Sequence, residues 1–201
     1  MQPQDILEYW FGDAANSKAE DLKDYFQRWF QGSKELDKEI ESRFGKAVKQ
    51  AVADDLATWK NTAEGKLALI ILLDQFTRNV YRGTDKAFAY DVKALRLCQN
   101  LIESGADKDL SWAERGFTYM PMQHTEDATV QQQGIKAYIG LVEDTPDDLK
   151  KVVTGFLLSA REHKSIVDKF GRFPHRNKVM ERESTDEELI YLATGAKSFG
   201  Q

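Results

Sequence analysis

The sequence predicts an all-α protein made of antiparallel helical hairpins. Apolar residues recur at helical spacing through most of the 201 residues, whereas the strict alternation typical of strands is nearly absent. Glycines and one proline punctuate this pattern, so the connections between helices are short. Short connections place successive helices antiparallel. A chain of this length buries roughly 70% of its unfolded surface in one core, and we expect a single domain over residues 1–201.

In the N-terminal half, glycines mark the ends of most helices. We expect helices over residues 3–11, 19–31, 33–54, 62–82 and 85–104. The terminating glycines are Gly12, Gly32, Gly83 and Gly105. The helix over 33–54 is charged and amphipathic, with apolar residues from Leu36 to Val48 on one face. The run Leu67 to Leu73 is apolar around the whole helix, which predicts burial on every side.

In the C-terminal half, capping signals mark the helices. We expect them over residues 111–118, 125–143, 146–171 and 184–195. The signals are the capping-box pairs Ser111 with Glu114 and Ser184 with Glu187, the cap Thr125, Pro146 at a helix start, and Gly171 after the longest helix.

Composition and charge exclude several classes of partner. The formal net charge is −5 and no basic run occurs, so no nucleic-acid surface is expected. Cys98 is the only cysteine, which excludes an internal disulfide and suits a reducing compartment. The start of the chain lacks signal-peptide features, and the run Leu67–Leu73 is far short of the ~20 residues that cross a bilayer. We therefore expect a soluble cytoplasmic protein with no membrane partner.

Polar clusters at helix ends or on apolar faces identify a candidate site. They are Asp74–Arg82, Tyr119–Asp127 with His124, Arg161–Lys164 with His163, and Phe170–Asn177 with His175. Burial makes an unpaired charge costly, so such clusters have either a structural or a binding role. We expect the four clusters to meet around one cavity.

The cluster that follows the apolar run has two compatible interpretations. Asp74, Arg78 and Arg82 are spaced four residues apart and share a helical face, which suits an internal salt-bridge network. Asp91 interrupts the apolar face of the next helix and needs a cation from this group. Alternatively, Arg78, Asn79 and Arg82 form an anion-facing fork at the mouth of a cavity.

The loop from Gly171 to Asn177 is the strongest candidate for binding. Arg172, His175, Arg176 and Asn177 supply several hydrogen-bond donors close together, which suits a carboxylate or phosphate group. The alternative is an arginine-rich turn that caps helix carbonyls.

Proton transfer is the chemistry that the histidines suggest. Imidazole exchanges protons near neutral pH, so His124 and His175 are the catalytic candidates, with Glu126 orienting or charging the imidazole. His163 lies on the apolar stripe of its helix, which favours a supporting place in the pocket wall.

Metal and cofactor chemistry lack a recognisable motif. No pair of residues has the His-x3-His or Glu-x2-His spacing of a helical metal site, and no phosphate loop, dinucleotide turn or serine elbow occurs. Cys98 lies on an apolar face, which fits a core thiol. We expect no metal and no cofactor.

Several multi-residue motifs occur together in order. They are Ile6–Gly12, Asp74–Gly83 with Ala87, Phe88 and Asp91, Glu114 and Arg115 with Phe117–Pro121, His124–Asp127, and Phe170–Asn177. On these motifs the chain resembles the bacterial domain-of-unknown-function 924 family over nearly its whole length. The resemblance implies a tetratricopeptide-like right-handed helical array and no particular activity. Gln123 replaces the Met typical of the family, and Glu181 replaces its Gly.

Two functions remain open at this point. The first is a binding or catalytic pocket for a small anionic molecule, with Asp74, Asp91, Glu114, Arg115 and His163 as structural support. The second is a helical-hairpin scaffold that binds a peptide or protein partner in a groove, an analogy at the level of the fold. A closed pocket that contains the histidines favours the first function, and an open concave face lined by Asn, Lys and Arg favours the second.

Overall fold

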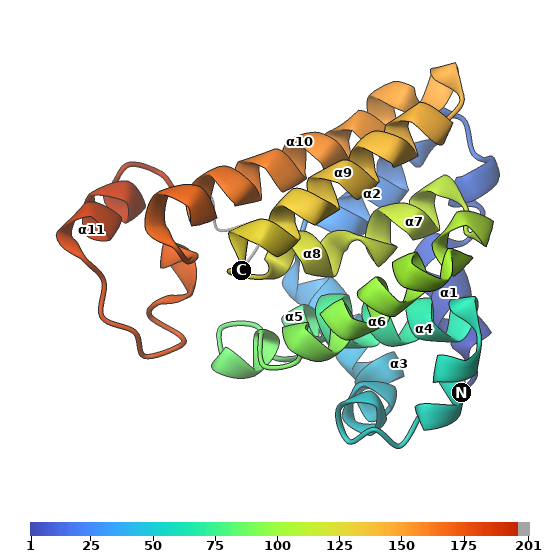
Figure 1. Cartoon of the computed structure of the whole chain (residues 1–201). Helices are drawn as coiled ribbons and strands as arrows, with labels where there is room; N and C mark the ends of the chain where they lie inside the picture. The colour runs from blue at the N-terminus through green and yellow to red at the C-terminus, as the bar shows by residue number, and fades with distance from the viewer. Residues whose placement is uncertain (197–201) are drawn as a thin grey trace.

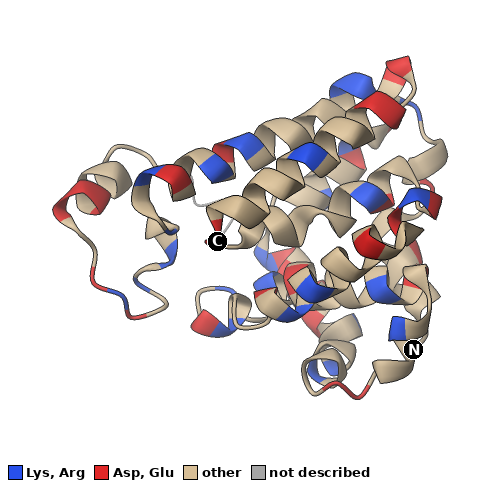
Figure 2. Ribbon diagram, in the orientation of Figure 1, with Lys and Arg blue, Asp and Glu red and all other residues tan. Residues whose placement is uncertain are grey.

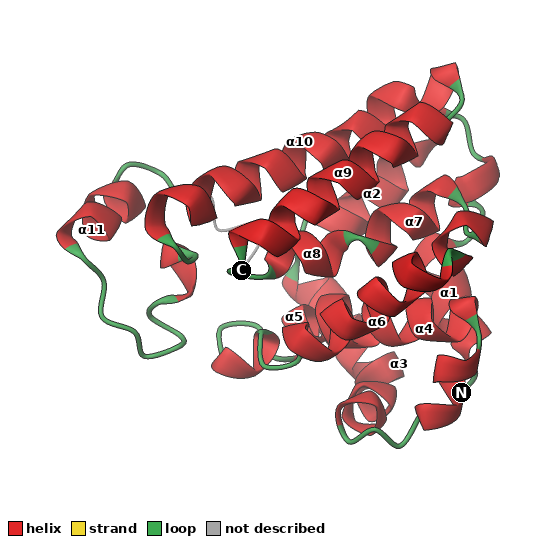
Figure 3. Ribbon diagram, in the orientation of Figure 1, coloured by secondary structure: helices red, strands yellow, loops and turns green. Residues whose placement is uncertain are grey.

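The protein is described as a computed structural model over residues 1–196, and within that range it contains helices and no strand (Figure 3). The expected all-α fold is therefore confirmed. The α-helices are α1 (Pro3–Phe11), α2 (Lys23–Phe30), α3 (Lys34–Val52), α4 (Ala63–Ile70), α5 (Thr77–Val80), α6 (Asp91–Ser104), α7 (Trp112–Thr118), α8 (Met120–His124), α9 (Ala128–Asp144), α10 (Asp147–Phe170) and α11 (Asp186–Ala193). No helix in the described part of the chain has the length and apolar character to span a membrane.

Helix α4 lies at the centre of the core. Every residue from Leu67 to Leu73 has at most 3% of its surface exposed, as its apolar circumference predicts. Helices α1 and α6 pack against α4, and the long helices α9 and α10 lie side by side along one edge of the molecule (Figure 1). Acidic and basic residues are interspersed along the helices (Figure 2).

A π-helical segment, Ile71–Phe76, joins α4 to α5. The sequence pattern predicts an uninterrupted helix over 62–82, whereas the structure has this wider turn in its buried middle. π-Helical turns are rare and occur often at functional sites. The segment carries Asp74 and Gln75 and precedes Arg78, so it positions part of the candidate site.

Some expected boundaries are wrong by a few residues. The helix expected over 85–104 begins only at Asp91, because Asp85–Ala87 forms a separate 3-10 turn. The helix expected from residue 125 begins at Ala128, where the Asp127 carboxylate, rather than Thr125, accepts two backbone N–H groups. The capping box of α11 uses Thr185 and Glu188, one residue beyond the expected pair.

Other local expectations agree with the structure. Ser111 and Glu114 form the expected capping box of α7. Gly171 ends α10 with a φ of 71°, a left-handed conformation that glycine adopts readily. Helix α8 was not expected, since its five residues include Pro121 and are too few to show a periodic pattern.

Candidate functional site

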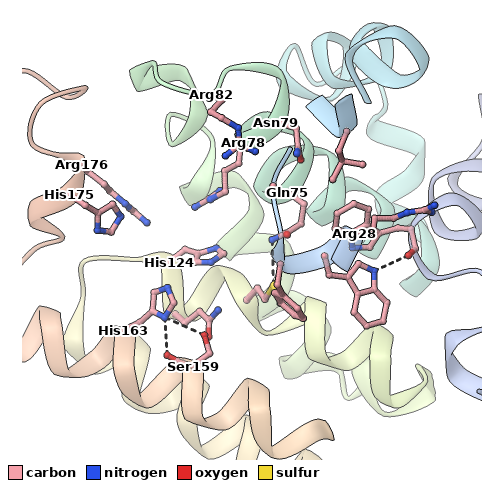
Figure 4. A pocket seen from close by; sticks show the side chains of 17 residues that line it. Arg28, Gln75, Arg78, Asn79, Arg82, His124, Ser159, His163, His175 and Arg176 are labelled. Atoms are coloured by element: carbon pink, nitrogen blue, oxygen red, sulfur yellow. Dashed lines mark hydrogen bonds between the residues drawn. The ribbon is translucent and has the colours of Figure 1, made fainter. Parts of the chain in front are cut away.

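A polar cavity of about 270 Å³ opens between α5, α8, α10 and the 3-10 turn Pro174–Arg176 (Figure 4). Its described walls consist of Trp10, Arg28, Trp29, Phe30, Gly32, Leu36, Gln75, Arg78, Asn79, Arg82, Met120, Gln123, His124, Ser159, His163, His175 and Arg176. Segments far apart in the sequence thus meet here, including all three histidines.

Arg78 is held by two carboxylates. Its guanidinium donates to both oxygens of Asp91 at 2.9 Å and lies 3.3 Å from Oδ1 of Asp74. It also donates to the Asp74 backbone carbonyl. Burial opposes a charged arginine, but the charges of Asp74 and Asp91 outweigh it and raise the pKa of Arg78. Arg78 is therefore a fixed cation in the wall of the cavity.

The positive charge of Arg176 is also buried, but carboxylates compensate it much less than they compensate Arg78. Only 6% of its surface is exposed, and its Nη1 lies 3.6 Å from Oδ2 of Asp91, which already accepts from Arg78. Within residues 1–196 its Nε has no hydrogen-bond partner. Burial, the largest influence, lowers the pKa of Arg176 to about 10; Asp91 opposes this shift and Arg78 adds to it. The charge persists at neutral pH but lacks a full set of hydrogen bonds.

The guanidinium of Arg176 lies between two aromatic rings. It is 4.5 Å from the centroid of Phe88 and 4.4 Å from that of Phe173. Contacts with ring faces stabilise a desolvated cation without using its N–H donors. The donors of Arg176 are thus held in a defined plane beside the cavity.

Arg82 and Asn79 share one carboxylate from α3. Arg82 donates to both oxygens of Asp37, at 2.7 and 2.9 Å, and the Asn79 amide donates to Oδ1 at 2.9 Å. Burial raises the pKa of Asp37, but these hydrogen bonds outweigh it and lower the pKa overall. The two residues line the cavity while their donors also anchor α5 to α3.

His124 is oriented by Asp74. Its Nδ1 lies 2.8 Å from Oδ1 of Asp74, whose side chain is fully buried. Burial raises the pKa of Asp74, but the charge of Arg78 and hydrogen bonds from His124 and Gln75 lower it overall, so this carboxylate is ionised. An ionised carboxylate only accepts, so Nδ1 carries the proton and Nε2 of the neutral ring is a base.

The other two histidines are kept neutral by burial. Burial lowers the pKa of His163 to about 3, and protonation of His124 would act in the same direction. Burial also lowers the pKa of His175 to about 4, with the charge of Arg176 as the next influence. The ring centroids of His124 and His163 are 5.7 Å apart. His163 donates through Nδ1 to the Ser159 carbonyl at 2.8 Å, which fixes it to the wall formed by α10.

Three predicted site residues lie outside the cavity lining. Glu126 accepts from both Nη groups of Arg182 and from the Phe173 backbone N–H, so it does not orient His124. Arg172 donates to both oxygens of Glu188 at 2.7 Å. The Asn177 amide donates to Ser184 and Glu188.

The expectations for Glu126, Arg172 and Asn177 are corrected accordingly. These side chains hold the segment after α10 against α11 and α9, and we assign them no contact with a ligand. Their adjacency in sequence to His124 or Arg176 suggested the wrong role, because neighbours on a turn point in different directions.

The residues expected to give structural support do so in different ways. Asp74 and Asp91 pair with the cavity arginine Arg78. Glu114 completes a capping box, and Arg115 donates to Asp144 and to the Tyr119 hydroxyl. The last two therefore stabilise α7 and α9 away from the cavity.

Several lining residues are not among the site residues predicted from the sequence. Arg28 donates to the Tyr9 carbonyl and lies 4.7 Å from the Tyr9 ring centroid, which fixes its guanidinium beside the cavity. Gln123 is 5% exposed, and among the described residues its Oε1 has no hydrogen-bond partner. Gln123 directly precedes His124 in the predicted cluster, and this position was the available signal, whereas Arg28 lies in an ordinary amphipathic stretch of the sequence that gave none. In the described range, no group of three or more His, Cys, Asp or Glu side chains is arranged to hold a metal ion.

The fold and this polar cavity define an all-helical protein with an arginine-lined internal wall, and comparison with known proteins then gives its family. The chain matches the family described as "Bacterial protein of unknown function (DUF924)" over residues 6–196 and belongs to it. It is similar to a solved structure, the protein of unknown function ATU0120 from Agrobacterium tumefaciens, with 34% identity and a TM-score of 0.78. That match covers 96% of this chain and 97% of the other. A comparison with curated proteins found no match.

Proposed function

We propose that the polar cavity binds a small molecule that carries a carboxylate or phosphate group. One observation carries the proposal: the described lining contains Arg28, Arg78, Arg82 and Arg176 but no Asp or Glu. The carboxylates that partly neutralise them, Asp37, Asp74 and Asp91, lie outside this lining. Guanidinium groups in a desolvated wall form strong charge-assisted hydrogen bonds with planar or tetrahedral anions.

Arg176 is the principal anion-binding residue of this proposal. Arg78 and Arg82 already donate to carboxylates in a bidentate manner, whereas Arg176 has one carboxylate at 3.6 Å and a buried Nε with no partner among the described residues. A bound anion would accept hydrogen bonds from the Nη groups of Arg176, which offsets the cost of burying this charge.

His124 is the proposed proton acceptor. Asp74 fixes its tautomer so that Nε2 is unprotonated, and burial favours the neutral ring at physiological pH. We expect it to take a proton from the bound molecule or from a water beside it. Loss of such a base typically slows a reaction by 10²–10⁴-fold, so any turnover should fall by about that factor in His124→Gln while anion affinity changes little.

The convergence of three histidines and four arginines in one cavity supports a small-molecule function over a peptide scaffold. A peptide-binding helical array would present its contact residues along an extended open groove.

Calorimetric titration with inorganic phosphate, phosphate monoesters and short carboxylates tests the proposal. The wild-type protein should bind at least one of these anions, and Arg176→Met should weaken that binding by at least tenfold. Arg172→Met is the matched control, because this arginine lies in the same loop and pairs with Glu188 instead. Equal affinity in wild type and Arg176→Met, or no binding of any anion, would contradict the proposal.

A further inference from the structure

A second cavity of about 290 Å³ adjoins the polar one. Phe30, Met120, Gln123 and Ser159 line both cavities, and Phe26, Gly155 and Phe156 complete the second. We call this second cavity the apolar chamber. The shared residues make the two spaces neighbours across one wall rather than separate features of the surface.

The two cavities differ sharply in chemistry. In the described structure no charged side chain lines the apolar chamber, whose walls are mainly aromatic rings and a thioether. Its only polar lining residues, Gln123 and Ser159, belong to the wall shared with the polar cavity. Polarity therefore falls from the arginine side, across the shared wall, to the phenylalanine side.

The volumes of the two cavities also favour a single ligand that occupies both. Ligand pockets usually measure about 300–1,000 Å³, and the two cavities, at about 270 and 290 Å³, each lie just below that range. Together they fall within it. A single occupant of both cavities would have its charge at one end and its apolar part at the other.

We infer that the natural ligand is amphipathic: a carboxylate or phosphate head in the polar cavity joined to an apolar chain or ring in the apolar chamber. This inference rests on the proposed anion-binding function and specifies its substrate class. Burial of apolar ligand surface against Phe26, Phe30 and Phe156 supplies affinity, and the arginines set the orientation.

Gln123 marks where the two parts of the ligand join. Its buried Oε1 is an acceptor without a partner among the described residues, and its side chain belongs to the shared wall. The Gln123 amide can donate to or accept from a hydroxyl or amide group at the junction of head and tail.

Two series of probes test the inference by calorimetry: n-alkyl phosphates and n-alkyl carboxylates from two to eight carbons, below their micelle-forming concentrations. Affinity should rise about fourfold for each methylene that enters the apolar chamber, and then level off when the chamber is full. The series that binds more tightly identifies the head group.

Gly155→Leu is the diagnostic variant. A Cβ at Gly155 meets no atom within 4 Å, so the larger side chain enters the chamber without a clash. It should lower the affinity for the octyl probe by at least tenfold relative to the ethyl probe. Gly140→Leu is the matched control, because a Cβ there also meets no atom within 4 Å and the position lies outside both linings. The control should leave the octyl-to-ethyl ratio unchanged.

The outcomes separate this inference from the proposed function. If short anions bind through Arg176 but chain length has no effect, the amphipathic inference is wrong and anion binding stands. If Gly155→Leu leaves the octyl-to-ethyl ratio unchanged, the tail lies elsewhere and the inference is again overturned. If 1-octanol binds as tightly as octyl phosphate, or if no probe binds, the proposed function and the inference both fail.

Discussion

Arg172 and Arg176 lie four residues apart in one loop, yet their guanidinium groups are paired very differently. Arg172 donates to both oxygens of Glu188 and to the Glu183 carbonyl. Arg176 is more deeply buried and lies 3.6 Å from a carboxylate that another arginine already occupies. Residue type alone therefore does not separate these two arginines, whereas the degree to which carboxylates compensate their charges does.

The first test concerns the carboxylate behind the cavity. Asp74→Ala removes an acceptor of His124 and a partner of Arg78, both largely buried. Breaking a buried pair in this way typically costs about 3–5 kcal/mol, and we expect the free energy of unfolding to fall by that amount. Denaturation with urea measures it. A loss below about 1 kcal/mol would mean that Asp91 alone compensates the cavity cations.

The second test compares the two arginines directly. Arg176→Met leaves Asp91 paired with Arg78 and removes an under-compensated buried charge, so we expect the free energy of unfolding to stay the same or rise by about 1–4 kcal/mol. Arg172→Met leaves the buried Glu188 without its main partner and should lower stability. Urea denaturation of both variants checks the signs. Destabilisation by Arg176→Met would show that this residue is structural.

The third test uses pH. The folded-state pKa values of His163 and His175 are depressed to about 3 and about 4, against about 6.5 for an unperturbed histidine. The unfolded chain therefore binds more protons between these values, and stability is lost as pH falls below about 6.5. Each histidine contributes up to about 1.4 kcal/mol per pH unit in that window. Denaturation at pH 7, 6 and 5 should show this slope, and His163→Gln should reduce it. An unchanged slope in the variant would mean that His163 is protonated in the folded state.

The smallest effect concerns the backbone of the loop that carries both arginines. Glu181 has a φ of 53°, a left-handed conformation that is strained for residues other than glycine. Glu181→Gly should raise the free energy of unfolding by up to about 1 kcal/mol, since relief of strain is partly offset by the flexibility of glycine in the unfolded chain. Asp54→Gly is the control. Asp54 has a φ of 62° but accepts hydrogen bonds from Lys60 and Lys93, so the gain there should be smaller. A larger gain at Asp54 would contradict this explanation.

Much of the fold was predictable because its signals are local. The cap at Ser111, the glycine after α10 and the apolar run of α4 each depend on a few consecutive residues, and each agrees with the structure. The short helix α8 and the 3-10 turns were not predictable, because fewer than six residues show no period. The π-helical turn was also missed, since the run Leu67–Leu73 that leads into it is apolar on every side and its pattern does not show where an extra residue is accommodated.

The candidate site was predictable only in part, because its parts are non-local. Buried histidines and arginines drew attention to Arg78, His124, His163, His175 and Arg176, which the structure brings to one cavity. The partners of these residues could not be inferred. Asp37 on α3 pairs with Arg82, and Arg28 on α2 lines the cavity. The sequence patterns of these two helices predict only that their charged residues face solvent.

The π-helical segment Ile71–Phe76 makes the site sensitive to the geometry of one buried turn as well as to its side chains. The wider turn contains one residue more than an α-helical path between the same ends. If the segment closed into an α-helix at its present length, α5 would turn by about 100° relative to α4. Arg78, Asn79 and Arg82 would then leave the cavity together, although none of them had been replaced. Deletion of one residue within the segment would instead restore the α-helical path and keep α5 in its present orientation. A one-residue gap at this point in a related sequence is therefore compatible with an intact arginine-lined wall.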